Sequence, residues 1–157
     1  MGVAGCGKSE VGARLASALG LPLVEGDTFH PPANVEKMRA GIPLDDADRA
    51  GWLQALASDL ASRRDGAVLT CSALKRRYRD VLRGGSPSLA FLHLQLTPAQ
   101  ARARVAARPG HFYSPSLVDS QFAALEDPAG EPRVLTVDAA LPLDAVVQAA
   151  LAGLRSG

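Results

Sequence analysis

The stretch GVAGCGKS, residues 2–9, decides the fold of this chain. It matches the pattern G-x-x-x-x-G-K-[ST] at every fixed position, and this pattern is typical of a loop that binds the phosphates of a nucleotide. Glycines let the backbone curl so that its N–H groups point inward at phosphate oxygens. The helix that follows adds its positive N-terminal end. The pattern predicts a nucleotide site made by Gly2, Val3, Ala4, Gly5, Cys6, Gly7, Lys8 and Ser9.

Lys8 and Ser9 end this loop and carry its chemistry. A lysine there supplies a point charge to the β- and γ-phosphates, and a serine hydroxyl can ligate Mg²⁺. We therefore expect Lys8 to be catalytic as well as nucleotide-binding, and Ser9 to be a magnesium ligand. A chance glycine-rich turn is the alternative. Against it, residues 8–19 carry apolar side chains at helical spacing and end before Gly20, a residue suited to a helix C-cap.

The region before the loop does not follow the usual pattern. A phosphate-binding loop of this kind normally follows a buried strand, and here only Met1 precedes Gly2. A few native residues are lacking, the start is misplaced, or the protein folds without that strand; we favour the first two explanations. Since this strand would lie in the middle of the sheet, we expect its absence to destabilise the fold and an extended N-terminus to raise the melting temperature.

The rest of the chain alternates strands with helices. This order predicts a parallel sheet with helices on both faces, in a single P-loop kinase domain over residues 1–157. Residues 28–63 form a helical insert and residues 108–125 a lid, which is where small-molecule P-loop kinases bind the acceptor and close the site. We expect strands over 21–25, 67–72, 89–95 and 134–138, and helices over 8–19, 31–40, 45–63, 74–83, 97–107, 114–126 and 142–155.

Composition excludes several classes of protein. The formal net charge of +1 argues against a general nucleic-acid binder, which usually has a marked basic excess. Two cysteines, Cys6 and Cys71, are too few for a disulfide scaffold and lack zinc-site spacing, so we expect reduced thiols without chemistry. No apolar run is long enough to span a bilayer. A GTPase is disfavoured because no N-K-x-D motif occurs, and a transport or helicase ATPase because no apolar strand ends in Asp-Glu.

Five segments together resemble the gluconokinases, in the shikimate-kinase-like branch of the P-loop kinases. They run in family order from Gly2 to Pro128, and all but the first are specific. The resemblance implies phosphorylation of D-gluconate at its terminal hydroxyl by MgATP, in a mostly cytoplasmic and often dimeric enzyme that binds neither membrane nor nucleic acid. The segments are GVAGCGKS, EGDTFHPPANVEKM, GIPLDDADRAGWL, CSALKRRYRDVLR and RPGHFYSPSLVDSQFAALEDP.

Two other functions stay open at this point. A kinase for another small anion, such as shikimate, would have the same loop and lid, and only the acceptor pocket would differ. A nucleotide-binding regulator with little turnover is disfavoured by the presence of Lys8, Ser9 and Asp27.

Asp27 stands just past a strand end, where open α/β sheets bind ligands. A carboxylate there can orient an acceptor hydroxyl and take its proton. Position alone leaves a turn cap equally open, and the resemblance favours the catalytic base. His30 matches the family's G-D-x-x-H-P and either donates to an acceptor hydroxyl or fixes the loop. Glu25 would point to the opposite side of a regular strand. A water-mediated contact with Mg²⁺ is the less favoured alternative for this residue.

Cationic residues must meet an anionic acceptor. Arg49 can grip a carboxylate with two hydrogen bonds, and Lys37 also lies in the insert. In the basic run we expect Lys75 and Arg79 to contact the acceptor carboxylate or the transferred phosphate; solvated helix charges are the alternative for all four. In the lid, Arg104 and Arg108 match family positions for nucleotide contacts, and His111 is a candidate for reaching the acceptor.

Overall fold

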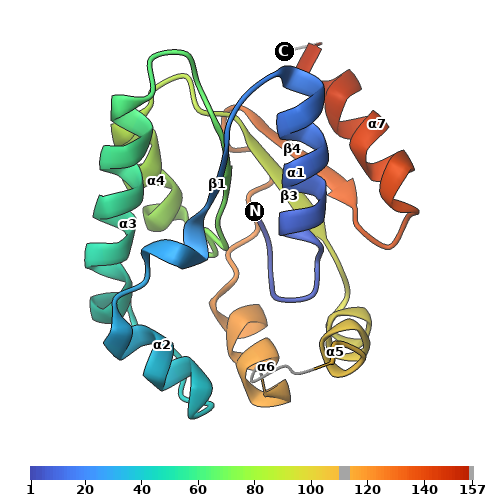
Figure 1. Cartoon of the computed structure of the whole chain (residues 1–157). Coiled ribbons are helices and arrows are strands. Elements are labelled where there is room, and N and C mark those ends of the chain that lie inside the picture. The colour runs from blue at the N-terminus through green and yellow to red at the C-terminus, as the bar shows by residue number, and fades with distance from the viewer. Residues whose placement is uncertain (110–113, 156–157) are drawn as a thin grey trace.

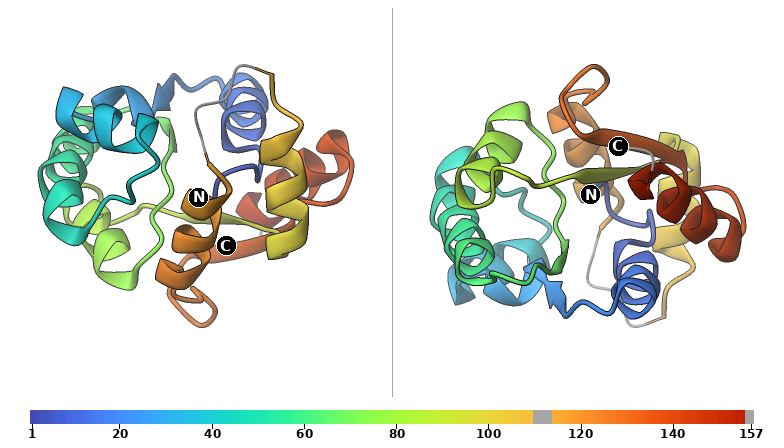
Figure 2. Two further views of the ribbon diagram at one scale, coloured as in Figure 1. Left: turned by 90° about the horizontal axis from the view of Figure 1, so that it is seen from below. Right: turned by 90° about the horizontal axis from the view of Figure 1, so that it is seen from above.

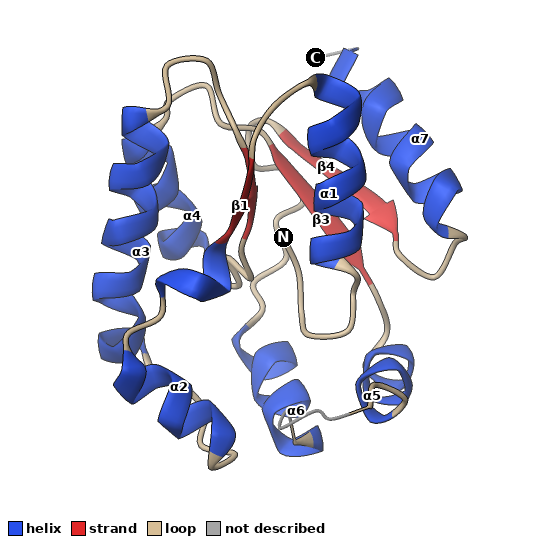
Figure 3. Ribbon diagram, viewed as in Figure 1, coloured by secondary structure: helices blue, strands red, loops and turns tan. Residues whose placement is uncertain are grey.

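The computed structural model describes residues 1–109 and 114–155. Its strands are parallel and form two pairs, β1 with β2 and β3 with β4 (Figure 3). The pairing aligns Val24 with Leu69, and His93 with Thr136. The strands are β1 (Leu23–Glu25), β2 (Val68–Thr70), β3 (Phe91–Gln95) and β4 (Val134–Asp138).

Helices cover both faces of these strands. In Figure 1, α1 and α7 lie together on one side, α3 and α4 on the other, and α5 and α6 beyond one end of the strands; Figure 2 shows the same grouping along the perpendicular direction. The predicted parallel α/β fold is thus confirmed. The helices are α1 (Lys8–Leu19), the 3₁₀ helix η1 (Gly26–Phe29), α2 (Pro32–Arg39), α3 (Asp46–Ser62), α4 (Arg76–Gly85), α5 (Pro98–Ala106), α6 (Pro115–Ala124) and α7 (Leu143–Arg155).

Each face has its own hydrophobic core. One core packs α1 and α7 against β3 and β4, with Val11, Leu15 and Val147 among its buried members. The other packs α3 and α4 against β2 and β3 around Trp52 and Leu56. Buried apolar surface on both faces is what a parallel sheet with helices on either side requires.

Several predicted boundaries differ from the structure by one or two residues, and two of the differences have a clear physical cause. We expected a strand over 67–72, but β2 ends at Thr70 because its partner β1 turns into η1 after Glu25 and offers nothing further to pair with. We expected Gly84 and Gly85 to end the basic helix, but α4 continues through both. A Cβ on Gly85 would lie 2.2 Å from the Ala57 carbonyl oxygen, so this glycine allows α4 to approach α3 closely.

Met1 and Gly2 bridge the two strand pairs. The Met1 amino group donates to the Leu92 carbonyl at 2.6 Å, and the Leu94 amide donates to Met1 at 3.0 Å. On the other side, the Gly2 amide donates to Ser72 at 3.2 Å. These bonds begin a parallel ladder between β2 and β3 that no described strand continues. Burial lowers the pKa of the Met1 amino group to about 6.

Above Met1 the space between β2 and β3 is an apolar groove. Its cavity volume is about 310 Å³, and side chains from α1, α3 and α4 close it from both faces, among them Val11, Leu15, Leu60 and Leu82. An extended segment there would bury apolar side chains on both of its faces. This is the place where the sequence predicts a central strand.

We predict that an apolar, β-branched extension of about five residues placed ahead of Met1 raises the melting temperature by roughly 5 °C or more. The added strand would pair with both neighbours and fill the groove, and about 1 kcal/mol corresponds to roughly 3 °C in a domain of this size. Thermal unfolding followed by circular dichroism measures the effect. A Gly/Ser extension of equal length is the control, and an equal melting temperature for both proteins would refute the prediction.

Arg79 on α4 is fully buried and holds the loop before β4. Its guanidinium contacts Glu131 at 2.5–3.1 Å and donates to the carbonyls of Ala73 and Glu126 at 2.8 and 3.1 Å. Arg83 adds a second ion pair to Glu131 at 2.8 Å. The hydrogen bonds from Arg79 lower the pKa of Glu131 from 4.5 to about 2. Arg79 is therefore a structural residue in this fold.

We predict that Glu131→Gln destabilises the protein by about 3 kcal/mol near pH 7, because it leaves Arg79 buried without an anionic partner. The folded-state pKa is depressed, so the contribution of Glu131 is complete above about 4.5 and declines as pH falls toward 2. Urea unfolding at several pH values should show the difference between the two proteins shrinking as pH falls. Asp144→Asn, which breaks the exposed pair with Arg14, is the control and should cost under about 1 kcal/mol. A pH-independent difference for Glu131→Gln would contradict this account.

Candidate active site

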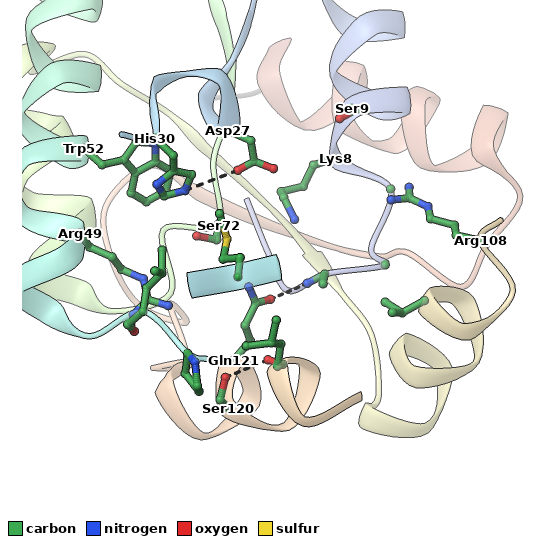
Figure 4. A pocket seen from close by; sticks show the side chains of 18 residues that line it. Lys8, Ser9, Asp27, His30, Arg49, Trp52, Ser72, Arg108, Ser120 and Gln121 are labelled. Carbon is green, nitrogen blue, oxygen red and sulfur yellow. Dashed lines mark hydrogen bonds and ion pairs between the residues drawn. The ribbon is translucent and has the colours of Figure 1, made fainter. Parts of the chain in front are cut away.

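A cleft opens where the strands end. The phosphate-binding loop forms one wall, η1 and the start of α3 form another, and α6 closes it from below (Figure 4). The carboxyl ends of parallel strands meet at this edge, as in other open α/β sheets. The cleft therefore collects residues that are distant in sequence, from Ala4 in the phosphate-binding loop to Gln121 on α6.

The loop has the backbone geometry that phosphate binding needs. Gly5 and Gly7 have φ values of 81° and 87°, in the region that glycine adopts without strain. No side chain caps the N-terminus of α1, so its first N–H groups stay available for an anion. The Lys8 ammonium donates to the carbonyls of Gly2 and Val3 at 3.1 and 3.0 Å, along the inner side of the loop.

Ser9 and Glu25 lie side by side at the edge of the cleft. The Ser9 hydroxyl donates to Glu25 Oε2 at 3.1 Å, and Thr70 donates to the same oxygen at 2.6 Å. The expectation that Glu25 points to the opposite side from Asp27 is wrong. Residues two apart on a regular strand share a face, and here β1 ends at Glu25 and η1 begins at once. A hydroxyl beside a carboxylate is an oxygen donor set of the kind that Mg²⁺ prefers.

Asp27 projects from η1 into the cleft, facing Lys8 (Figure 4). Its side chain is 82% exposed, and its Oδ1 lies 4.0 Å from His30 Nε2. Among the hydrogen bonds of the described residues, none involves the Asp27 carboxylate, whereas a turn cap would need one. The group is thus accessible to a ligand in the cleft.

His30 is held from two sides at the same wall. Its ring stacks on Trp52 with centroids 4.2 Å apart, and Trp52 Nε1 donates to the Gly26 carbonyl at 2.8 Å. Asn34 Nδ2 lies 3.3 Å from His30 Nδ1. Burial lowers the pKa of His30, against an opposing effect of Asp27. The imidazole is therefore biased toward its neutral form.

Arg49 is a buried cation that lines the cleft. It is 8% exposed, donates to the Leu44 carbonyl and lies 5.7 Å from the centroid of the Tyr78 ring. No ion pair within residues 1–109 and 114–155 involves Arg49, although buried guanidinium groups normally have an anionic partner. The cleft thus offers a site for a carboxylate at this point.

Three predicted acceptor contacts do not line this cleft. Lys37 is bound by Asp48 at 2.7 Å and ties α2 to the first turn of α3. Lys75 is the N-cap residue of α4 and pairs with Asp46 at 3.0 Å. Arg79 is buried against Glu131, so the contact with an acceptor that we expected of it is wrong. The sequence showed that these three residues are cationic. In the folded chain, each already forms an ion pair with a carboxylate from another part of the structure.

The lid residues have different placements. Arg108 lines the cleft beside the loop. Arg104 donates to the carbonyls of Gly5 and Ala139 at 3.5 and 2.7 Å, so it lies at the outer side of the loop. His111 falls outside the described residues.

Three residues that line or support the cleft were not predicted from the sequence. Trp52 and Asn34 sit in quoted segments, and the i, i+4 spacing of His30 and Asn34 could have indicated their contact. Gln121 on α6 accepts a hydrogen bond from the Ala4 amide at 2.6 Å, which joins the lid to the loop. No sequence signal predicts this last contact, because 117 positions separate the two residues.

A phosphate-binding loop facing a carboxylate across the edge of a parallel sheet is the arrangement of a P-loop kinase. A family model described as an AAA domain matches residues 1–128. The chain is 47% identical to a gluconokinase from Gluconobacter oxydans (strain 621H) over 94% of this chain and 85% of the relative. It therefore belongs to the gluconokinase family, which confirms the resemblance inferred from the sequence.

Two further relatives agree. The thermoresistant gluconokinase of Escherichia coli (strain K12) is 42% identical, with 100% of this chain and 92% of the relative covered. The crystal structure of a gluconokinase from Sinorhizobium meliloti 1021 superimposes with a TM-score of 0.93 at 50% identity, over 99% of this chain and 89% of that one. Within the described residues no helix is long and apolar enough to cross a membrane.

We predict that Arg49→Lys raises the KM for the acceptor roughly tenfold or more and changes the KM for the nucleotide little. Lysine keeps the charge but loses the planar fork that grips a carboxylate, and a lost charge-assisted hydrogen bond is worth about 1.5–3 kcal/mol. Steady-state kinetics with each substrate varied in turn measures both constants. Arg14→Lys on the exposed face of α1 is the matched control, and an unchanged acceptor KM for Arg49→Lys would exclude the contact.

Proposed function

We propose that this protein transfers the γ-phosphoryl group of ATP to the terminal hydroxyl of D-gluconate, giving 6-phospho-D-gluconate. One observation supports this most directly: Asp27 and Arg49 line the same cleft as the phosphate-binding loop. Gluconate carries a carboxylate at one end and a primary hydroxyl at the other. A cleft with a cation for the first and an exposed carboxylate for the second suits such an acceptor. The relatives named above are themselves gluconokinases.

In this mechanism the loop binds the phosphates and Asp27 handles the proton. The amides of the loop and the start of α1 cradle the phosphates, and Lys8 neutralises charge on the transferred group. Asp27 orients the acceptor hydroxyl and takes its proton as the oxygen bonds to the γ-phosphorus. The bond from that phosphorus to the β–γ bridging oxygen breaks, and ADP leaves.

We assign the magnesium site to Ser9, with Glu25 beside it. Their adjacent oxygens fit a hard cation held partly through water. When bound, Mg²⁺ would neutralise charge on the β- and γ-phosphates. Thr70 keeps the Glu25 carboxylate in place through its hydroxyl.

The lid completes the nucleotide site in this proposal. Arg108 would clamp the phosphates or stack on the base, and Arg104 would contact the nucleotide from the outer side of the loop. Closure of the lid would exclude water, which otherwise competes as phosphoryl acceptor. Arg102 on α5 pairs with Asp119 on α6 at 2.6 Å and so joins α5 to the helix within the lid. Contacts of Lys37, Lys75 and His111 with the acceptor, a cytoplasmic location and a homodimer stay predictions.

The decisive experiment measures ADP release from ATP with gluconate, shikimate and nucleoside monophosphates in parallel. We expect gluconate alone to give turnover well above background. We also predict that Asp27→Asn lowers kcat by about 100-fold or more, the usual effect of losing a general base, while ATP affinity is kept. Calorimetric titration with a nonhydrolysable ATP analogue checks that affinity. No signal with gluconate would refute the proposed substrate, and lost nucleotide binding in Asp27→Asn would make Asp27 a structural or metal-binding residue.

A further inference from the structure

The two nitrogens of the His30 ring face different surroundings. Nδ1 lies 3.3 Å from the side-chain nitrogen of Asn34, and Nε2 faces the Asp27 carboxylate at 4.0 Å. A neutral imidazole carries its proton on one nitrogen only, and the partner of the other nitrogen decides which one. Whether Nε2 donates or accepts in the cleft therefore depends on Asn34.

The amide orientation of Asn34 follows from its second partner. Asn34 is 3% exposed, and its Nδ2 lies 2.9 Å from the backbone carbonyl oxygen of Asp48. A carbonyl oxygen only accepts, so the Asn34 NH₂ group and not its oxygen must face it. One N–H of that group donates to Asp48, and the other is directed at His30 Nδ1. Nδ1 must then accept.

The His30 ring cannot easily turn away from this partner. Its plane stacks on Trp52 at an angle of 17°, and its side chain is 5% exposed. Trp52 is itself fixed to the Gly26 carbonyl, at the start of the 3₁₀ helix that carries Asp27. The stack on Trp52 therefore fixes the position of His30 relative to Asp27.

We infer that Asn34 is a positioning residue that holds His30 in its Nε2–H tautomer, so that His30 donates to the acceptor hydroxyl beside Asp27. This inference rests on the proposed function. The 4.0 Å between His30 Nε2 and Asp27 Oδ1 is too long for a hydrogen bond, but one oxygen can lie about 2.8 Å from both atoms. A hydroxyl there accepts from Nε2–H, gives its proton to Asp27 and keeps a lone pair for phosphorus. In the other tautomer Nε2 would compete with Asp27 for the hydroxyl proton.

The charges around His30 favour this arrangement near neutral pH. Asp27 from η1 and Arg49 from α3 act on the ring with opposite signs, and burial outweighs both in lowering its pKa. On the α2 side, the Asp48 carboxylate is neutralised by Lys37. The lowered pKa biases His30 toward its neutral form, which is the form in which its tautomer matters.

Nitrogen-15 NMR of the histidine side chains tests the tautomer without any turnover. His30 signals are assigned by their loss in His30→Gln. We expect long-range ¹H–¹⁵N spectra of the wild-type protein to show an unprotonated Nδ1 and a protonated Nε2. A protonated Nδ1, or an averaged mixture of the two forms, would overturn the inference. Because this readout needs no substrate, it stays decisive even if gluconate is not phosphorylated.

Asn34→Asp tests the catalytic consequence. A carboxylate at this position accepts from Nδ1–H, so neutral His30 switches tautomer and its pKa rises. We expect kcat to fall roughly tenfold at about pH 8.5, the size of one lost hydrogen bond. The ratio of the variant kcat to the wild-type kcat should then rise again toward about pH 6, because a protonated imidazolium ring donates from both nitrogens. A ratio that is constant with pH would contradict the positioning role.

Two other variants separate positioning from loss of stability. Asn34→Ala removes the partner of Nδ1 without adding a carboxylate that raises the pKa of His30, so its kcat should fall and recover less toward about pH 6 than that of Asn34→Asp. Ala33→Gly, at an exposed neighbouring position of α2, lowers helix propensity but leaves the contacts of His30 intact. Melting temperatures are measured for all variants. If Ala33→Gly reproduced the pH-dependent loss of Asn34→Asp, the effect would belong to the helix and the inference would be overturned.

Discussion

The hydrogen bonds of Met1 and Gly2 hold the two halves of this fold together. They link Ser72, which follows β2, to Leu92 and Leu94 of β3. Among the described strands, β2 and β3 do not pair with each other and no strand joins them. The phosphate-binding loop starts at this bridge, so it emerges at the edge where all strands end. Asp27 reaches this edge from the single turn of η1, which directly follows β1.

The cations around the cleft differ in whether they already have a carboxylate partner. Most cations of the insert and the basic helix already have carboxylate partners, as Lys37 has Asp48 and Lys75 has Asp46. These pairs are partly exposed and worth little by themselves, but they fix α2 and α4 against α3. Arg49, by contrast, is buried at the cleft without such a partner among the described residues. Under the proposed function, the carboxylate of the acceptor would supply the anionic partner of Arg49.

The neutral groups beside Asp27 form an ordered chain of contacts. Trp52 stacks on His30, and Asn34 links the histidine to the first turn of α3. Since burial lowers the pKa of His30 and biases the ring toward its neutral form, the contacts with Asn34 and Trp52 bear mainly on the direction of its hydrogen bonds. In the proposed mechanism His30 donates to the acceptor oxygen while Asp27 accepts its proton, and both groups lie on this wall of the cleft.

The sequence by itself determined the nucleotide loop, the parallel α/β class and the family, and it predicted Asp27 as the catalytic base. These follow from local patterns: glycine spacing, helical and strand periodicity, and motifs along a few residues. Tertiary structure decided which cations reach the cleft, because an ion pair such as Arg79–Glu131 joins residues 52 positions apart. It also decided the end of β2 and the approach of α4 to α3 at Gly85. Burial and partnership are properties of the packed chain, and no local pattern contains them.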